Sequence, residues 1–173
     1  MREYWLTPLP EFEEDASCAP IDMSCVAEAA AVTAECAGQS REFEGEDEAW
    51  MVSWLNGTEP NAADCGSDSF AVIGARVEGE LAGVACVCVY SRGSARGPIL
   101  WLRELAVSPR FQKRGLGRKL VKAAVAHGRR CGATRSFLMA DDMNANAVAL
   151  YKSVGYEENP DEAQIDLIFG PEE

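Results

Sequence analysis

The chain has little of several things that membrane proteins and secreted proteins use. Its longest apolar run, residues 81–90, is about half the length that a membrane-spanning helix needs. The first ten residues, MREYWLTPLP, lack the apolar segment of a secretory signal. Repeats and low-complexity tracts are also missing. We therefore expect a cytoplasmic protein that has no membrane partner.

Histidine is nearly absent, and the cysteines do not form a metal-binding pattern. The seven cysteines are an odd number, and their spacing is not that of a disulfide framework. Cys86 and Cys88 lie closest together, and alternation along a strand would place both on one face. A structural zinc would need more ligands nearby than the single histidine, His127, can add. We expect reduced, packed thiols and no metal.

Basic residues are scarce in the first half of the chain. Residues 1–90 hold three basic and eighteen acidic side chains, whereas residues 91–173 hold thirteen basic and ten acidic ones. Between Glu104 and Asp141 there are nine basic residues and no acid. This division fits a site with one wall for an anion and another for a cation, or it serves solubility alone. At a net charge of −12 we expect no nucleic-acid partner.

Apolar periodicity and turn residues predict one α/β domain over residues 1–173 with a mixed sheet. Strands are expected at residues 3–9, 69–77, 80–90, 99–107, 136–140 and 164–170. Helices are expected at residues 22–37, 46–55, 115–131 and 144–154. The predicted order of elements is β-α-α-β-β-β-α-β-α-β, with room for one more strand.

The segment SPRFQKRGLGRKLV, residues 108–121, predicts an anion site. It follows a strand end and enters a helix, whose unpaired N–H groups and dipole favour phosphate. Gly115 and Gly117 remove side chains that would keep a phosphate away. The cations of the segment are Arg110, Lys113, Arg114, Arg118 and Lys119. A Walker A loop and a Rossmann fingerprint are absent, and a basic surface helix with flexible glycines is the alternative.

Two motifs resemble those of the GNAT superfamily of acyl-CoA-dependent N-acetyltransferases. Gln112-x-x-Gly115-x-Gly117, directly after the strand end LAV, is similar to the pyrophosphate-binding motif of that family. NANAVALYKSVGY resembles its signature Asn-x-x-Ala-x-x-Leu-Tyr-x-x-x-Gly-Phe/Tyr. The resemblance is specific over residues 99–156 and rests on element order over residues 1–90. It implies a single-domain GNAT-like α/β fold, with a central mixed, mostly antiparallel sheet flanked by helices.

The resemblance also implies that acetyl-CoA binds to residues 91–173. Backbone groups of Leu105, Ala106 and Val107 would pair with the pantetheine arm as an added strand does. Asn144 would touch the cofactor or only cap its helix. The residue that meets the 3′-phosphate is left open. The pyrophosphate would lie on the backbone amides of Gln112, Lys113, Arg114, Gly115, Leu116, Gly117, Arg118 and Lys119.

The implied reaction is direct attack of a primary amine on the thioester, with no covalent enzyme intermediate. Tyr151 would be the general acid that protonates the leaving thiolate, and a packed core tyrosine is the alternative. A backbone N–H near Val107 would polarise the acetyl carbonyl.

The general base is left open. Some members of the family carry a glutamate in the strand before the catalytic helix, where this chain has Met139. Glu104 is the best remaining candidate, with an ion pair to Arg103 or Arg110 as its alternative role. Asp141 and Asp142 would act through water or only form a turn.

The acidic first part, residues 1–90, would form the acceptor side. Its acids Glu42, Glu44, Glu46 and Asp47 would suit a cationic amine such as a polyamine, an aminoglycoside-like amine or a lysine. We thus expect transfer of an acetyl group from acetyl-CoA to a small cationic amine, a protein lysine or a protein N-terminus. An acyl-CoA-binding regulatory module with little turnover is the alternative, and a homodimer is left open.

Overall fold

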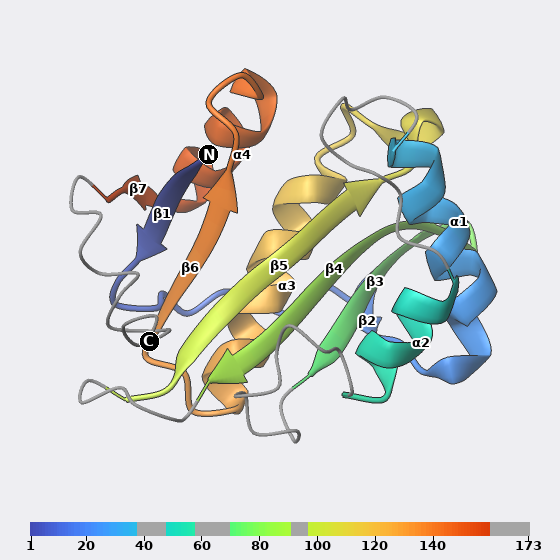
Figure 1. Ribbon diagram of the computed structural model, residues 1–173, viewed down its shortest axis with the longest axis horizontal. Coiled ribbons are helices and arrows are strands. Elements are labelled where there is room, and N and C mark those ends of the chain that lie inside the picture. Colours follow the sequence, from blue (N-terminus) through green and yellow to red (C-terminus); the bar gives the residue numbers. More distant parts are fainter. Residues whose placement is uncertain (38–47, 58–69, 91–96, 160–173) are drawn as a thin grey trace, which may run out of the picture.

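The computed structural model describes residues 1–37, 48–57, 70–90 and 97–159 (Figure 1). The strands are β1 (Arg2–Leu6), β2 (Cys18–Pro20), β3 (Ala71–Val77), β4 (Glu80–Tyr90), β5 (Ile99–Val107), β6 (Arg135–Ala140) and β7 (Glu157–Glu158). The α-helices are α1 (Val26–Ala37), α2 (Glu48–Leu55), α3 (Leu116–Arg130) and α4 (Ala145–Val154). Short 3-10 turns at Met23–Cys25 and Pro109–Phe111 precede α1 and α3.

The strands form one sheet in the order β2-β3-β4-β5-β6-β1-β7. All its pairings are antiparallel except that of β5 with β6, which is parallel. The parallel register runs only from Ile99 opposite Arg135 to Leu102 opposite Leu138. Beyond Leu102 the edge of β5 that faces β6 pairs with no strand in the described ranges. This separation of two parallel strands fixes the position of the site described below.

Helices cover both faces of the sheet (Figure 1). Helices α1 and α2 pack on one face, against β3, β4 and β5, where Met51 and Trp54 are fully buried. Helix α3 covers the opposite face of β3, β4 and β5 with its apolar side, and α4 packs beside α3. Strand β4 is buried after its first residue because it is covered on both faces, which explains its continuous apolar run.

The predicted fold class is confirmed, with differences at the sheet edges. The hairpin at Glu78 and Gly79 forms as expected, with φ values of 51° and 84° at the two turn residues. Strands β2 and β7 were not predicted, because three and two residues are too short for a periodic signal. The predicted strand at residues 164–170 lies outside the described residues. None of the helices in the described ranges combines the length and apolarity that crossing a membrane requires.

We expect the substitution Gly128→Ala to destabilise the fold. Alanine in place of a helical glycine ordinarily stabilises by about 1 kcal/mol. At Gly128, however, an added methyl group would lie 2.8 Å from a Leu100 methyl carbon on β5, and overpacking costs about 1–3 kcal/mol. Urea unfolding should show the loss, and a double-mutant cycle with Leu100→Ala should show that the two changes offset each other. A Gly128→Ala protein more stable than wild type would contradict this packing.

Candidate active site

A β-bulge redirects strand β5 at the point where it leaves β6. Cys86 of β4 lies opposite Glu104, and its neighbour Val87 lies opposite Leu102, so Arg103 is the extra residue. After the bulge, Glu104 lies on the face covered by α1, because it shares that face with Cys86. Leu105 instead packs in the core on the α3 side. The bulge therefore brings a carboxylate to the α1 face beside the unpaired edge of β5.

Tyr151 of α4 approaches the same place from the opposite face of the sheet. Its side chain is buried and packs edge to face on Tyr156, with 6.1 Å between the ring centroids. Burial, then the Glu104 carboxylate, then Tyr156, raise the pKa of the Tyr151 phenol well above its usual value. The phenol is therefore protonated at neutral pH and able to donate a proton. Its hydroxyl group makes no hydrogen bond to another described residue.

Glu104 is held next to a cation on its own strand. Its carboxylate lies 3.2 Å from Arg103 Nη1, and its side chain is 15% exposed. The Arg103 guanidinium also lies over the Trp101 ring, 5.7 Å from the ring centroid. Of the two ion pairs considered for Glu104, the one with Arg103 is formed, whereas Arg110 pairs with Glu80. Glu104 contributes negative charge to the site, because its carboxylate is one of the groups that raise the pKa of Tyr151.

The carboxyl end of β5 is fixed by hydrogen bonds from two other segments. The Val107 carbonyl accepts a bond of 3.0 Å from the Gln112 side chain and another of 3.0 Å from the Cys36 thiol at the end of α1. The next residue, Ser108, donates its N–H to Ala82 O (2.8 Å) and its hydroxyl to Glu35 (2.5 Å). Sequence reasoning missed the contacts of Cys36 and Glu35, because they span more than seventy residues and no local pattern signals them.

The loop before α3 has the backbone shape of an anion-binding nest. Lys113 and Gly115 have positive φ values of 61° and 78°, and Arg114 between them does not. Such alternation turns successive N–H groups toward one point. Helix α3 begins directly after Gly115, which is its N-cap, so its first amides point the same way. A Cβ atom at Gly115 would meet nothing within 4 Å, so the space beside this glycine is open.

Gly117 has a packing role that its motif position did not reveal. A Cβ atom there would lie 3.0 Å from a Leu150 methyl carbon, so the glycine lets α3 approach α4 closely. The helix that carries Tyr151 is thereby held against the helix that follows the nest. The motif residue Gly117 therefore positions two parts of the site relative to each other.

Some of the motif cations are already committed to carboxylates. Lys119 lies 3.0 Å from Asp15, whose pKa is lowered to about 2, first by hydrogen bonds from Ser17 and then by Lys119. Arg110 pairs with Glu80. These two cations have partners within the protein, so they are less suited to binding an external anion.

Three other cations of the segment are available. Lys113, Arg114 and Arg118 form no ion pair with the described residues, and all three are exposed. The Arg114 guanidinium lies over the Phe111 ring, 5.4 Å from its centroid. Lys113 and Arg114 belong to the nest and Arg118 to the first turn of α3, and their charge suits phosphate groups.

The start of α4 is organised by side chains that cap and tether it. Asn144 is the N-cap, and its Oδ1 accepts a hydrogen bond of 3.1 Å from the Ala147 N–H. Asp141 accepts from the Met143 N–H (2.9 Å), as a turn residue does. Asp142 pairs with Arg2 at 2.7 Å. Asn144 thus caps α4 and Asp141 stabilises the turn before it. Contact of Asn144 with a cofactor stays a prediction.

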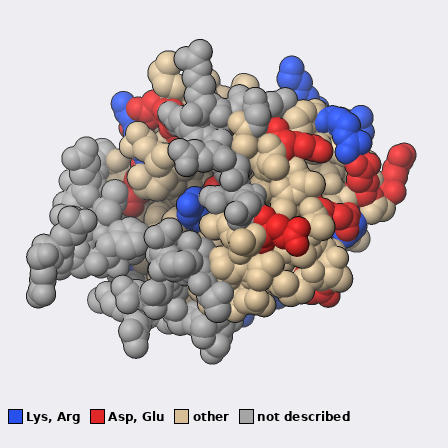
Figure 2. All heavy atoms as spheres, turned by 45° about the vertical axis from the view of Figure 1, so that its right-hand side comes forward, with Lys and Arg blue, Asp and Glu red and all other residues tan. Residues whose placement is uncertain are grey.

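The predicted acidic acceptor wall lies outside the described residues, which include none of Glu42, Glu44, Glu46 and Asp47. On the described part of the molecule, Figure 2 shows acidic and basic side chains interspersed over the side that carries α1 and α2. Arg76 of β3 and Glu28 of α1 form an ion pair, with 3.2 Å between their charged atoms. The described surface of this side is therefore of mixed charge.

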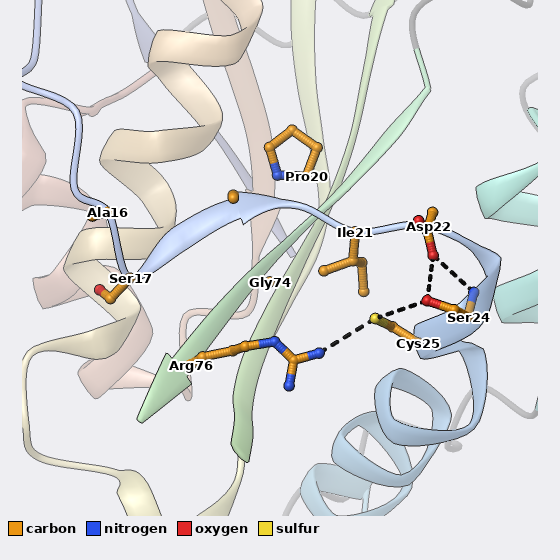
Figure 3. A pocket seen from close by; sticks show the side chains of 10 residues that line it. Ala16, Ser17, Pro20, Ile21, Asp22, Ser24, Cys25, Gly74 and Arg76 are labelled. Carbon is orange, nitrogen blue, oxygen red and sulfur yellow. Dashed lines mark hydrogen bonds between the residues drawn. The ribbon is translucent and has the colours of Figure 1, made fainter. Parts of the chain in front are cut away.

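Two hollows on the described surface lie away from the separated strands. One, of about 260 Å³, lies beside β2, and in it the Arg76 guanidinium points toward the Cys25 thiol at 3.3 Å (Figure 3). The other, of about 420 Å³, lies between β1 and α4 and is lined by Tyr4 and Lys152 among others. Neither contains the Tyr151 phenol or the nest. We place the candidate site at the separated strands, because the groups suited to acid chemistry and anion binding meet there.

Residues 37–156 match the family model described as the acetyltransferase (GNAT) family. The chain belongs to this family. The match spans both the nest and the helix of Tyr151, so the GNAT resemblance predicted from these motifs is confirmed. Over the described residues, no group of three or more potential metal ligands is found.

Named GNAT relatives cover only part of the chain. Streptothricin acetyltransferase of Streptomyces lavendulae is 34% identical over 101 residues, which are 58% of this chain and 49% of the relative. Spermine/spermidine N(1)-acetyltransferase of Bacillus subtilis is 30% identical over 91 residues, 50% of this chain and 59% of the relative. The chain thus spans about half the length of the curated relatives it matches.

A solved structure shares the fold over nearly the whole chain. An aminoglycoside N-acetyltransferase in complex with CoA superimposes with a TM-score of 0.65 at 16% identity. The superposition covers 88% of this chain and 95% of that one. At 16% identity this likeness shows that the two proteins share a fold, and nothing beyond that.

We expect Glu104→Gln to lower the pKa of Tyr151. The Glu104 charge raises that pKa, so removing the charge must move it down, although burial keeps it above the usual value. A fluorinated tyrosine at position 151, which ionises at lower pH, would bring the titration into a range where the fold persists. Absorbance titration of this protein with and without Glu104→Gln measures the shift. Glu35→Gln is the matched control, and an equal shift in both variants would contradict the placement of Glu104.

Proposed function

We propose that this GNAT protein transfers an acetyl group from acetyl-CoA to a primary amine by direct attack. The observation that carries the proposal is the end of the β5–β6 pairing at Leu102 and Leu138, which leaves the edge of β5 beside the buried phenol of Tyr151. We further propose that residues 1–173 act as one domain. Residues 91–173 would bind acetyl-CoA, and residues 1–90 would contribute the acceptor side.

The described residues fit an acyl-CoA in three respects. The backbone of Leu105, Ala106 and Val107 offers a strand edge to the two amide groups of a pantetheine arm. The nest at Lys113 to Gly115 and the first amides of α3 suit a pyrophosphate. The cations without protein carboxylate partners, Lys113, Arg114 and Arg118, are the candidates for the remaining phosphate charge. No other part of the described structure combines such an edge with such a nest.

The chemistry proposed for Tyr151 follows from its environment. A bound acetyl-CoA supplies an activated acetyl group whose carbonyl carbon is attacked by a neutral amine. As the C–N bond forms and the C–S bond breaks, the CoA thiolate needs a proton. The Tyr151 phenol is protonated at neutral pH because burial and Glu104 disfavour its phenolate form, so it can donate that proton. The phenol is reprotonated from solvent afterwards.

For the acceptor we propose a cationic amine. The relatives named above include acetyltransferases of streptothricin and of spermine and spermidine, and all of these molecules carry several amino groups. The decisive experiment is a panel of amines containing spermidine, a streptothricin, an aminoglycoside and a lysine peptide, with free CoA thiol as the readout. Release of CoA with at least one amine is expected. Tight acetyl-CoA binding with no release for any amine would contradict the proposal and favour a regulatory acyl-CoA-binding module.

We expect Arg118→Ala to weaken acetyl-CoA binding about ten-fold, since a hydrogen bond to a charged group contributes about 1.5–3 kcal/mol. Lys119→Ala is the matched control on the next residue of α3. Lys119 is already paired with Asp15, so its loss should change the affinity by less than about three-fold, in line with the small effect of an exposed ion pair. Calorimetric titration of both variants measures this. Equal effects at the two positions would show that ion pairing within the protein does not decide which cation binds phosphate.

We expect Tyr151→Phe to lower kcat by on the order of 100-fold, the lower range for loss of a general acid, and to leave the acetyl-CoA Kd unchanged. Tyr156→Phe is the matched control, because this neighbouring phenol hydrogen-bonds Ser136 at 2.7 Å within the core. It should lower stability and leave kcat nearly unchanged. A Tyr151→Phe protein with wild-type turnover would remove Tyr151 from the mechanism.

A further inference from the structure

We propose that Glu3 of strand β1 is the carboxylate that receives the acceptor ammonium and takes up its proton. This inference rests on the proposed amine acetylation. It concerns the removal of a proton from the acceptor amine. Strand β6, which precedes the helix of Tyr151, offers no carboxylate for this step and has Met139 instead. Glu3 lies far from Met139 in the sequence, and the sheet topology places the two residues side by side.

The register of the sheet puts Glu3 directly beside the position of Met139. Strand β1 lies between β6 and β7, and Glu3 is the partner of Met139 in the antiparallel pairing. Side chains directly opposite each other share a face, with Cβ atoms about 4.5–5.5 Å apart. A carboxylate on Glu3 therefore reaches the same space as one on residue 139 would. Met139 itself is 36% exposed, so the side chain beside Glu3 borders solvent.

This shared face is the one that carries Glu104. Two residues along from Glu3, Trp5 stacks on Phe137 with 5.3 Å between the centroids, and Phe137 stacks on Trp101 of β5 at 6.0 Å. Trp101 lies opposite Cys88, on the face of β4 that also bears Cys86, the partner of Glu104. The intervening residue Tyr4 points the other way, into the core that contains Tyr151. The acceptor carboxylate and the proposed acid Tyr151 thus lie on opposite faces of the sheet.

Glu3 and Met139 also lie at the point along the strands where the pairing of β5 with β6 ends. Met139 directly follows Leu138, the last residue of β6 that pairs with β5. On β5, Glu104 lies two residues past Leu102, which is the partner of Leu138. Because β5 and β6 are parallel, Met139 and Glu104 lie on either side of the place where the two strands separate. Glu3 is one strand further out than Met139.

The Glu3 carboxylate is oriented and incompletely satisfied. Glu3 is only 6% exposed. Its Oε2 accepts a hydrogen bond of 3.1 Å from the Asn159 side chain, which fixes the carboxylate. Its Oε1 is buried and has no hydrogen-bond partner in the described structure. A buried carboxylate oxygen without a donor is costly, and the N–H groups of an ammonium would satisfy it.

Charged side chains on neighbouring strands share the face of the sheet that carries Glu3. On its own strand, Arg2 points to the other face, where it pairs with Asp142 and Glu158. Among the described residues, the charged ones on the face of Glu3 include Arg103 and Glu104 on β5, Arg135 on β6 and Glu157 on β7. The two arginines lie over the Trp101 and Trp5 rings.

The proposed step balances its protons as follows. The acceptor enters as R–NH₃⁺ and transfers one proton to Glu3. The neutral amine attacks the thioester carbonyl carbon, and the C–S bond breaks as Tyr151 protonates the thiolate. The nitrogen then loses a second proton to solvent water. Tyr151, which gave its proton to the thiolate, regains one from solvent. Glu3 releases its proton to solvent, so the overall reaction yields the amide, CoA thiol and one proton.

The test is the pH dependence of kcat/KM in Glu3→Gln, with Glu157→Gln as the matched control. Glu157 lies opposite Trp5 on the adjacent strand β7 and is exposed. We expect Glu3→Gln to lower kcat/KM by on the order of 100-fold, as for loss of a general base. It should also abolish the fall of kcat/KM at acidic pH and leave the acetyl-CoA Kd unchanged. A wild-type pH profile in Glu3→Gln, or the same change in Glu157→Gln, would overturn the proposal.

A second variant separates chemistry from folding. Adding Met139→Glu to Glu3→Gln returns a carboxylate to the same face, and we expect at least ten-fold recovery of kcat/KM together with the acidic limb. A Glu3→Gln protein that is merely misfolded would not recover in this way. Lack of recovery, with normal acetyl-CoA binding by the double variant, would contradict the role assigned to this position.

Calorimetry distinguishes failure of this inference from failure of the proposed function. The amine of the panel that releases most CoA, or spermidine if none does, is titrated onto the CoA-loaded wild type and onto CoA-loaded Glu3→Gln. If no amine releases CoA from the acetyl-CoA complex, the proposed function fails, and binding that is lost in Glu3→Gln still supports Glu3 as the ammonium site. Equal binding by both proteins, or none by the wild type, overturns the assignment of Glu3. If turnover occurs and Glu3→Gln matches the wild type, only the assignment of Glu3 fails.

Discussion

The arrangement of the site depends on one feature of backbone pairing: the parallel contact between β5 and β6 stops at Leu102 and Leu138. An unpaired strand edge inside a sheet is costly, because its N–H and C=O groups need partners. The fold keeps this edge beside a nest of amides and a buried phenol, which are the groups an acyl-CoA would use. The bulge at Arg103 adds the Glu104 carboxylate on the α1 face.

The cost of separating the strands is offset by contacts that hold the end of β5. The Val107 carbonyl accepts from both Gln112 and Cys36, and Ser108 bonds Ala82 and Glu35. The Val107 carbonyl thus joins the nest side, through Gln112, to the α1 side, through Cys36. A shift of α1 would therefore displace the end of β5, from which the chain continues into the nest.

Local sequence patterns predicted the parts of the site that lie close together in the chain. The nest and the Tyr151 helix were found because Gln112, Gly115 and Gly117, and then Asn144 and Tyr151, have fixed spacing within single elements. The register that places Glu3 beside Met139 could not be predicted, because β1 is a short strand from the start of the chain that lies between β6 and β7. The thiol of Cys36 and the Leu150 contact of Gly117 likewise depend on tertiary packing, which periodicity does not encode.

Hydrogen–deuterium exchange of the protein with and without acetyl-CoA tests most directly whether the separated strands hold the ligand. The amides of the unpaired edge of β5, residues 104–107, and of the nest and first turn of α3, residues 113–119, should be protected together on binding. Strand β3, which is paired on both sides without the ligand, should exchange at an unchanged rate. Acetyl-CoA binding that leaves both of these segments unprotected, or that protects only the hollow beside β2, would contradict the placement of the site.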